Sequence, residues 1–338
     1  MPGMSPQFSP ELFFDNVNGY YRTAAIKAGI EMEVFTKVGE RGCDAPTLAR
    51  QCQAPQRGIR ILCDYLTTIG FLCKEQQRYF ITKEMAMFLN KNSPGYIGGT
   101  IDFLLSDEVM SSFTNLTKTI QTGKTITSEQ GALDPDHPQW VKFAKAMQPV
   151  MSLASMVLAE RVDQERDKPL KVLDVACGHG LFGIAFAKQN PYVEVTAADW
   201  SNVLTVAKEN AEIAGVSERM RYVPGDAFEQ DLGEGYDIVL FANFLHHFSP
   251  SKCEEIIAKA HHCLKHDGRA VTFEFIANQD RISPPLASIF TMMMLGTTPE
   301  GDVYTFEEIK QMFSNCGFKN SELHSLSPVL EKAVISYK

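Results

Sequence analysis

One stretch, residues 172–180, restricts the possible fold more than any other part of the chain. It begins in a short apolar run, 171–176, which Asp174 interrupts and which is typical of a parallel strand buried on both faces. Gly178 and Gly180 then predict a tight turn before a packed helix. We expect glycine there because a Cβ would keep a ligand from the backbone, and the N–H groups of the helix start would face that ligand. The stretch therefore predicts a strand, a ligand-binding turn and a helix.

From residue 171 onward, strand and helix patterns alternate, which predicts a parallel sheet with crossover helices. The last two strand patterns are joined by too short a segment for a parallel crossover, so we expect them to pair antiparallel. The fold class is therefore α/β, with a Rossmann-like sheet closed by an antiparallel hairpin. Strands are expected at 171–176, 193–199, 219–223, 236–242, 269–276, 320–326 and 332–337, and helices at 180–189, 201–214, 249–264, 284–295 and 305–316.

The first hundred residues follow a different, mostly helical pattern. Asp44 is expected as an N-cap with Pro46 in the first turn of a helix. The order of two helices and a hairpin predicts a winged-helix arrangement, and basic side chains only modestly outnumber acidic ones at 41–83. A dimerisation or substrate-lid module is therefore favoured over a DNA-binding one. Helices are expected at 10–28, 32–38, 44–52 and 56–69, and hairpin strands at 71–73 and 79–81.

Between these two parts, the patterns predict a helix at 107–123, a polar linker at 123–138 and a long helix at 138–161. The long helix carries an apolar stripe of methionine and aromatic side chains immediately before the first strand of the sheet. Two interpretations stay open for this stripe, plain core packing and a roof over the bound ligand.

Composition and charge exclude several classes of function. The 338 residues carry a net charge of −9, which argues against a broadly basic nucleic-acid surface. No apolar run approaches the length that spans a bilayer, so we expect no membrane partner. The eight cysteines form no CxxC pair, which favours reduced thiols and a cytoplasmic protein. We expect no metal, because His262 and His266 are predicted at the end of a crossover helix, away from the strand tips.

The nature of the ligand depends on Asp174. The pattern Gly178-x-Gly180-x-x-Gly183 also satisfies the dinucleotide fingerprint, so NAD and S-adenosylmethionine compete as ligands. A carboxylate at Asp174 would repel a pyrophosphate but attract the ammonium and sulfonium groups of S-adenosylmethionine. Asp199, at the end of the second strand, can accept both hydroxyls of an adenosine ribose, a use that both ligands share. The sequence thus favours S-adenosylmethionine.

These motifs, in this order at successive strand ends, resemble those of class I S-adenosylmethionine-dependent methyltransferases. Residues 172–180 resemble the family's (V/I)LDxGxGxG motif, with Ala176-Cys177 departing from the usual glycine. Residues 225–228, GDAF, resemble the motif whose aspartate accepts the adenine amino group. The resemblance implies S-adenosyl-L-methionine as cofactor and S-adenosyl-L-homocysteine as product. The implied cofactor-binding residues are Asp174, Gly178, Gly180, Asp199, Trp200, Asp226, Ala227, Phe228 and Asn243.

A narrower resemblance concerns the end of the fourth strand. Residues 245–250, LHHFSP, followed by Cys253, resemble the LHDWxD motif of plant-type (caffeate- and hydroxyindole-like) O-methyltransferases, which have an N-terminal winged-helix dimerisation domain. His246 falls on the family's catalytic base, and Glu274, 28 residues later, on one of its two flanking glutamates. Val303 takes the position of the second glutamate, and His247 replaces the aspartate of the motif.

The chemistry explains why a carboxylate is needed beside the base. Methyl transfer is an in-line displacement, and the acceptor's proton must leave as the methyl group arrives. Proton transfer from a phenol to a histidine is uphill by roughly 5 kcal/mol. We therefore expect concerted proton removal, with Glu274 stabilising the imidazolium of His246.

The resemblance also implies an apolar, adaptable acceptor pocket, lined in part by the helix expected at 284–295. The expected acceptor-binding residues are Phe143, Met147, Met151, His247, Phe290, Met293 and Met294.

Together these features imply a cytoplasmic homodimer that methylates a hydroxyl of a small aromatic acceptor of the secondary-metabolite type. The expected divisions are a winged-helix-like dimerisation domain at 1–100, a helical linker and substrate roof at 101–165, and a catalytic domain at 166–338. Two alternatives stay open. One is a carbon or nitrogen methyltransferase on the same scaffold, since LHH also occurs in class I methyltransferases that act on carbon or without a base. The other is a winged-helix regulator that senses a ligand with its sheet.

Overall fold

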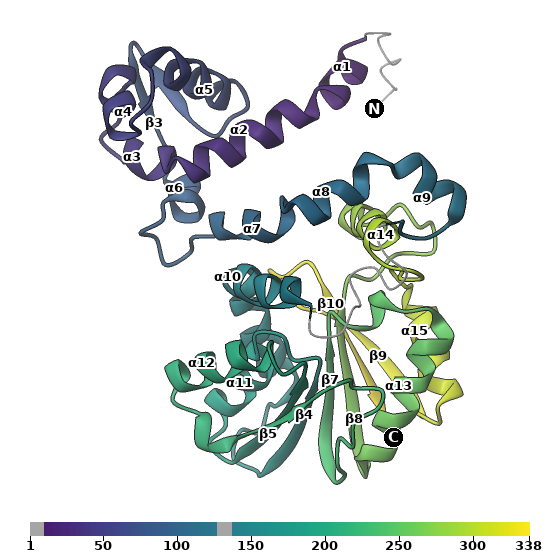
Figure 1. The fold of residues 1–338 in the computed structure, drawn as a ribbon. Helices are drawn as coiled ribbons and strands as arrows, with labels where there is room; N and C mark the ends of the chain where they lie inside the picture. The colour runs from purple at the N-terminus through teal and green to yellow at the C-terminus, as the bar shows by residue number, and fades with distance from the viewer. Residues whose placement is uncertain (1–9, 127–136) are drawn as a thin grey trace, which may run out of the picture. The chain divides into compact units, whose positions relative to one another are not determined.

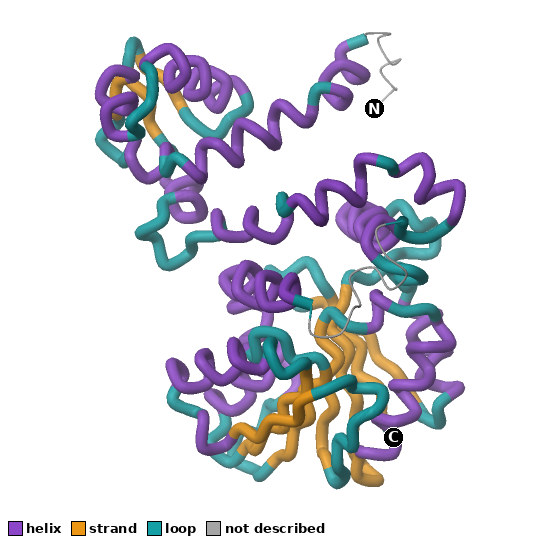
Figure 2. Tube along the Cα trace, viewed as in Figure 1, coloured by secondary structure: helices purple, strands orange, loops and turns teal. Residues whose placement is uncertain are grey.

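The computed structural model of the protein describes residues 10–126 and 137–338. The chain divides into two compact units, Met1–Ile101 and Asp102–Lys338, which are drawn in Figure 1 and coloured by secondary structure in Figure 2. Each unit has its own hydrophobic core.

The first unit packs short helices around a small antiparallel sheet with strand order β1-β3-β2. Asp44 caps α4 as predicted, because its Oδ1 accepts a hydrogen bond of 2.8 Å from the N–H of Thr47. The hairpin prediction is confirmed, and β1 adds a third strand to it. The elements are α1 (Glu11–Val17), α2 (Gly19–Glu31), α3 (Val34–Val38), β1 (Cys43–Asp44), α4 (Ala45–Gln51), α5 (Gln56–Thr68), β2 (Cys73–Glu75), β3 (Arg78–Phe80), α6 (Lys83–Leu89) and η1 (Gly98–Thr100).

The second unit is built on one seven-stranded sheet with strand order β6-β5-β4-β7-β8-β10-β9. The strands from β6 to β8 run parallel, and β10 pairs antiparallel with both β8 and β9, as the short final connection predicted. The strands are β4 (Leu170–Val175), β5 (Val193–Asp199), β6 (Met220–Pro224), β7 (Tyr236–Ala242), β8 (Leu264–Glu274), β9 (Asn320–Ser325) and β10 (Lys332–Tyr337).

Helices cover both faces of this sheet, with α11 and α12 on one side and α13 and α15 on the other (Figure 1). The central strands bury both faces, because alternate side chains enter different cores. Val172 and Ile238 pack with Phe186 of α11, whereas Leu173 and Val239 pack with Ile257 of α13. The remaining elements are α7 (Ile101–Leu104), α8 (Asp107–Thr114), α9 (Leu116–Thr122), α10 (Pro138–Val162), α11 (Leu181–Gln189), α12 (Leu204–Ala214), η3 (Ser217–Arg219), η4 (Leu245–His247), α13 (Pro250–Cys263), α14 (Pro285–Thr297) and α15 (Phe306–Asn315).

The structure differs from the sequence prediction at several element boundaries. The helix expected at 10–28 is interrupted at Asn18 and then continues to Glu31, and the one expected at 107–123 is interrupted at Asn115. An asparagine, a residue of low helix propensity, stands at both interruptions, and neither side chain forms a capping hydrogen bond. The strand expected at 269–276 begins earlier and ends at Glu274, so His266 lies in β8 and not on a helix.

Two other segments bear on the predictions. Most of the polar linker expected at 123–138 lies outside the described residues. The apolar stripe of α10 enters the core of the sheet, where Met151, Ala154 and Leu158 pack with residues of α11. No helix among the described residues is both long enough and apolar enough to traverse a bilayer.

Candidate active site

A cavity opens where the carboxyl ends of β4, β5, β6 and β7 meet, beneath the first half of α10. This is the edge at which parallel α/β sheets bind ligands, because the chain connections diverge there. The cavity is lined by Trp140, Phe143, Met151, Ala176, Cys177, Gly178, His179, Phe182, Asp199, Trp200, Val203, Gly225, Asp226, Ala227, Phe228, Ala242, Asn243, Phe244, His247 and Phe248.

The turn after β4 requires its two glycines for different reasons. Both have positive φ, 56° at Gly178 and 73° at Gly180. A Cβ on Gly178 would meet no protein atom within 4 Å, so this backbone is open to the cavity. A Cβ on Gly180 would lie 2.9 Å from Cβ of Ala207 in α12, and Gly180 does not line the cavity. Gly180 therefore also serves the packing of α12.

Asp174 lies under the cavity and not on its wall. It is fully buried, and its Oδ2 accepts a hydrogen bond of 3.0 Å from the N–H of Gly183, while Oδ1 has no partner. Burial raises the pKa of Asp174 to about 7, with a smaller contribution from the charge of Asp199. The side chain therefore supports the start of α11 through one of its two carboxylate oxygens.

Asp199 is held in place at the end of β5 by two backbone N–H groups. Its Oδ2 accepts from Gly178 and its Oδ1 from Trp200, both at 2.7 Å. Burial raises the pKa of this carboxyl to about 6, and the two hydrogen bonds oppose the rise. Each carboxylate oxygen retains a lone pair for a further donor, such as a ribose hydroxyl.

A third wall of the cavity is the loop after β6, with Asp226, Ala227 and Phe228. Oδ1 of Asp226 accepts from the N–H of Phe228 at 2.9 Å. From α13, Nζ of Lys259 donates to the carbonyls of Ala227 (2.8 Å), Phe228 (3.0 Å) and Gln230 (2.5 Å). Sequence reasoning missed Lys259, because nothing in the pattern of α13 indicates which loop its exposed face meets.

The fourth wall carries the residues of the predicted catalytic pair. His246 and Glu274 are both buried, and Nδ1 of His246 lies 2.5 Å from Oε2 of Glu274. The other carboxylate oxygen, Oε1, accepts from the N–H groups of Phe244 and Leu245, at 2.9 Å each. These bonds leave Nε2 as the nitrogen of His246 that is available to an acceptor.

The His246 ring does not itself line the cavity. It lies between the Phe290 ring of α14, at 4.8 Å between centroids, and the His247 ring, at 4.3 Å. His247 faces the cavity. Burial, and then the neighbouring His246, hold the pKa of His247 well below its usual value.

Where the family motif has its second glutamate, Val303 is fully buried against Ala277 and Ala287 and offers no carboxylate to His246. Residues 301–305 instead brace the turn that carries His246. The N–H of Asp302 donates to the carbonyl of His246 at 3.0 Å, and a Cβ on Gly301 would lie 2.5 Å from that carbonyl oxygen.

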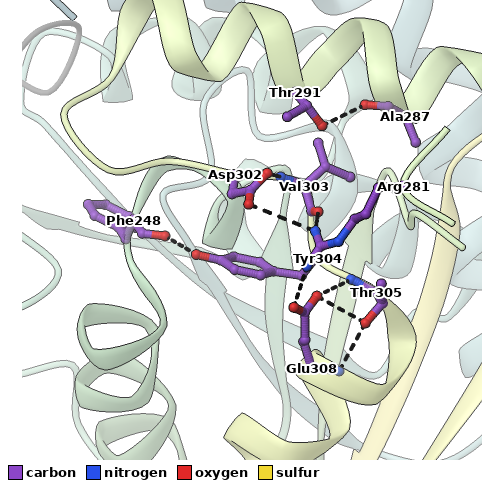
Figure 3. A network of polar contacts seen from close by, with 9 residues as sticks. All are labelled: Phe248, Arg281, Ala287, Thr291, Asp302, Val303, Tyr304, Thr305 and Glu308. Atoms are coloured by element: carbon purple, nitrogen blue, oxygen red, sulfur yellow. Dashed lines mark hydrogen bonds and ion pairs between the residues drawn. The ribbon is translucent and has the colours of Figure 1, made fainter. Parts of the chain in front are cut away.

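The brace is itself anchored, as Figure 3 shows. The Tyr304 hydroxyl donates to the carbonyl of Phe248. Arg281 donates to the carbonyl of Val303 at 2.8 Å and forms ion pairs with Glu308 and Asp302. The backbone position of the turn is therefore secured without the second glutamate.

The expected acceptor-binding residues are only partly brought together. Phe143, Met151 and His247 line the cavity, and Phe290 contacts His246 from α14. Three others do not line the cavity: Met147 packs on the main core, Met294 is buried in α14, and Met293 lies beside it. The spacing of methionines on a helix does not say which side of the helix meets the cavity.

His179 is a cavity residue that sequence reasoning missed, although it is the middle residue of the Gly-x-Gly turn. Its Nδ1 accepts from the N–H of Leu181 at 3.1 Å, and burial lowers its pKa to about 4. The imidazole is therefore neutral, with its proton on Nε2 as a hydrogen-bond donor.

Comparison with known proteins agrees with this geometry. A family model for the O-methyltransferase domain matches residues 116–319, and one for the O-methyltransferase dimerisation domain matches residues 14–91. One relative is the 3-hydroxy-5-methyl-1-naphthoate 3-O-methyltransferase of Streptomyces sahachiroi. It is 26% identical over an alignment that covers 91% of this chain and 89% of the relative. The L-tyrosine C(3)-methyltransferase of Streptomyces lavendulae is 24% identical, covering 87% of this chain and 82% of the relative. The crystal structure of a candidate O-methyltransferase from Nostoc punctiforme PCC 73102 is 47% identical, with a TM-score of 0.94 over 98% of this chain and 100% of that one.

Proposed function

Because the chain belongs to the O-methyltransferase family, with the family's dimerisation domain before its catalytic domain, we propose that it methylates a hydroxyl of a small aromatic acceptor with S-adenosylmethionine. The observation that carries the proposal is the shared cavity edge. Gly178, Asp199 and Asp226 line one part of it, and another part is the turn of His246, whose ring is paired with Glu274 at the end of β8.

The residues of the cavity fit S-adenosylmethionine. We assign Asp199 to the ribose hydroxyls, Asp226 to the adenine amino group, and Trp200, Ala227 and Phe228 to the flanks of the adenine. The open backbone at Gly178 and the donor at His179 suit the amino-acid part of the cofactor, and Oδ1 of Asn243, which is buried without a partner, suits its ammonium group. Bound S-adenosylmethionine supplies an electrophilic methyl group.

His246 is assigned as the general base. Glu274 holds its Nδ1 at 2.5 Å, so Nε2 takes the hydroxyl proton as the acceptor oxygen is methylated. The two N–H groups that donate to Oε1 keep the carboxylate oriented, and its charge stabilises the imidazolium that forms.

The proposal includes a homodimer formed through the first unit. Apolar side chains along α1 and α2 are exposed, among them Leu12 (75%), Phe13 (62%) and Tyr20 (61%), and a second copy would bury them. The eight cysteines are all unpaired, which agrees with a cytoplasmic location. Sedimentation of the purified protein should give twice the monomer mass, and Leu12→Asp with Phe13→Asp should shift it toward monomer.

Calorimetric titration with S-adenosylmethionine, S-adenosylhomocysteine and NAD tests the cofactor, and mass spectrometry of a panel of phenols tests the reaction. Micromolar binding of the first two ligands and a gain of one methyl group on a phenolic oxygen are expected. Binding of NAD alone would contradict the proposal.

A carbon methyltransferase is the second candidate, because the relative from Streptomyces lavendulae carries that name. The two differ in their need for a base at the acceptor oxygen. Fragmentation of the product locates the new methyl group, and a methyl group on ring carbon would replace the first candidate by the second.

A further inference from the structure

Three polar side chains of the cavity wall carry a buried atom without a hydrogen-bond partner: Nε1 of Trp140, Oδ1 of Asn243 and Nδ1 of His247. Such an atom costs about 1–3 kcal/mol, so native proteins seldom retain several of them in one place without a ligand. The assigned cofactor residues Asp199 and Asp226, by contrast, already accept backbone hydrogen bonds. If Asn243 meets the cofactor's ammonium group, Trp140 and His247 are left for the acceptor.

Trp140 and His247 form one corner of the cavity beside the assigned base. Their rings are 5.5 Å apart and nearly perpendicular, at 84°, and Phe143 meets the other side of the indole at 5.9 Å. The His247 ring is 4.3 Å from the His246 ring. An acceptor that presents a hydroxyl to His246 therefore brings the neighbouring part of its ring system to this corner.

The protein groups around the corner favour an uncharged partner over an anionic one. Burial keeps the pKa of His247 well below its usual value, so the imidazole is neutral at physiological pH, and an indole N–H only donates. Among the described residues, the cavity wall contains no lysine or arginine, whereas it contains the carboxylates of Asp199 and Asp226. The described cavity wall therefore supplies no cation of its own to pair with a carboxylate on the acceptor at this corner.

We propose that Trp140 and His247 form a specificity site that selects uncharged aromatic acceptors with a second oxygen, placed on the carbon adjacent or peri to the hydroxyl that is methylated. This inference rests on the proposed function and names its substrate class. The indole N–H donates to a lone pair of the second oxygen, and Nδ1 of His247 donates to it or accepts from it according to the tautomer. We infer adjacent or peri placement because the His246 and His247 ring centroids lie only 4.3 Å apart, so that two oxygens on neighbouring positions of one ring system suit both residues.

Three probes that share one ring system test the site in the full-length protein. They are 2-naphthol, which has no second oxygen, 2,3-dihydroxynaphthalene, whose second oxygen is uncharged, and 3-hydroxy-2-naphthoate, whose adjacent group is anionic. We expect kcat/KM for the diol to exceed that for either other probe by about tenfold or more, because polar sites discriminate strongly against partners that leave them unpaired.

Matched variants separate hydrogen bonding from packing. Trp140→Phe keeps an aromatic ring and removes the N–H donor. His247→Leu removes the polar ring nitrogens, whereas His247→Asn puts a polar amide in their place. Trp140→Phe and His247→Leu should each lose about tenfold more kcat/KM on the diol than on the naphthol, mainly through KM. His247→Asn should retain most of the diol preference. Phe143→Leu changes the packing of the same corner but no polar atom, so it should lower kcat/KM for the diol and for the naphthol equally.

The outcomes distinguish a hydrogen-bonding specificity site from simple packing. Equal losses on the diol and the naphthol in Trp140→Phe, with Tm near that of the unchanged protein, would show that the indole only packs and would overturn the inference. A preference for the naphthoate would also overturn it. If S-adenosylmethionine binds but no probe is methylated, affinities of the three probes for the S-adenosylhomocysteine complex give the same comparison, and absence of any diol preference there rejects the site. Failure of S-adenosylmethionine itself to bind would reject the proposed function and not merely the specificity site.

Discussion

The two halves of the cavity differ in how complete they are. In the half assigned to the cofactor, the carboxylates of Asp199 and Asp226 already accept backbone hydrogen bonds, and Lys259 holds the adjoining loop through three carbonyls. In the half assigned to the acceptor, the rings of Trp140 and His247 present nitrogens with no partner. The carboxylates of the cofactor half are oriented before any ligand binds, and Oδ1 of Asn243 is the atom there that still lacks a partner. In the acceptor half, both polar rings wait for a ligand to complete them. A family that keeps one cofactor and changes its acceptors would show this difference.

The largest effect expected concerns His246, the proposed base on the acceptor side. His246→Ala should lower kcat by about 10²–10⁴-fold, the usual contribution of general base catalysis. The affinity for S-adenosylhomocysteine, measured by calorimetry, should hardly change, because the ring does not line the cavity. If turnover is unaltered in His246→Ala, His246 is not the base, and the carbon methyltransferase becomes the favoured candidate.

The burial of Asp174 destabilises the folded protein by an amount that depends on pH. The folded-state pKa of Asp174 is raised to about 7, so between about pH 4 and pH 7 the unfolded chain loses this proton while the folded chain keeps it. The folded state is therefore destabilised as pH rises through this window, by up to about 4 kcal/mol, and the cost is constant above it.

Asp174→Asn should remove that dependence while retaining an acceptor for the Gly183 N–H. The difference in the free energy of unfolding between the variant and the original protein, from urea melts at pH 5 to 8, should grow in favour of the variant as pH rises. A difference that is the same at every pH would refute the raised pKa.

Asp199→Ala tests the ribose assignment directly. Losing hydrogen bonds between two hydroxyls and a charged carboxylate should weaken binding of S-adenosylmethionine by about 100-fold or more, since such bonds contribute roughly 1.5–3 kcal/mol each. Titration calorimetry measures the change. An affinity within threefold of the original would place the adenosine elsewhere in the cavity.

A smaller effect is expected from Lys259, which acts on the cofactor only through the loop it holds. Lys259→Met should weaken S-adenosylmethionine binding by about tenfold, and Lys259→Arg should restore part of the loss, because charged donors to carbonyls are worth about 1.5–3 kcal/mol. Lys252→Gln is the matched control on the same helix. Its ammonium lies 4.1 Å above the Phe228 ring, a contact worth about 0.5–1 kcal/mol at an exposed site, so it should cost only a few-fold. If Lys259→Met and Lys252→Gln weaken S-adenosylmethionine binding equally, Lys259 has no special role in holding the loop.

The sequence by itself determined the order of strands and helices, the closing hairpin, the turn at Gly178 and the carboxylate at Asp199. These depend on local patterns: side-chain periodicity sets each strand, and a polar residue directly after a buried strand must lie at the ligand-binding edge of a parallel sheet. The spacing of His246 and Glu274 was implied by the resemblance to the family's motif, and the structure places Nδ1 of His246 2.5 Å from Oε2 of Glu274.

Only the tertiary structure decided how the helices complete the cavity. Three contacts join segments that are far apart in the chain. Gly180 packs against Ala207, Lys259 holds the loop after β6, and residues 301–305 support the turn of His246. The same holds for the corner of Trp140 and His247, which joins α10 to a turn more than a hundred residues later. Periodicity shows which side of a helix is apolar, but only packing against the sheet shows what that side meets.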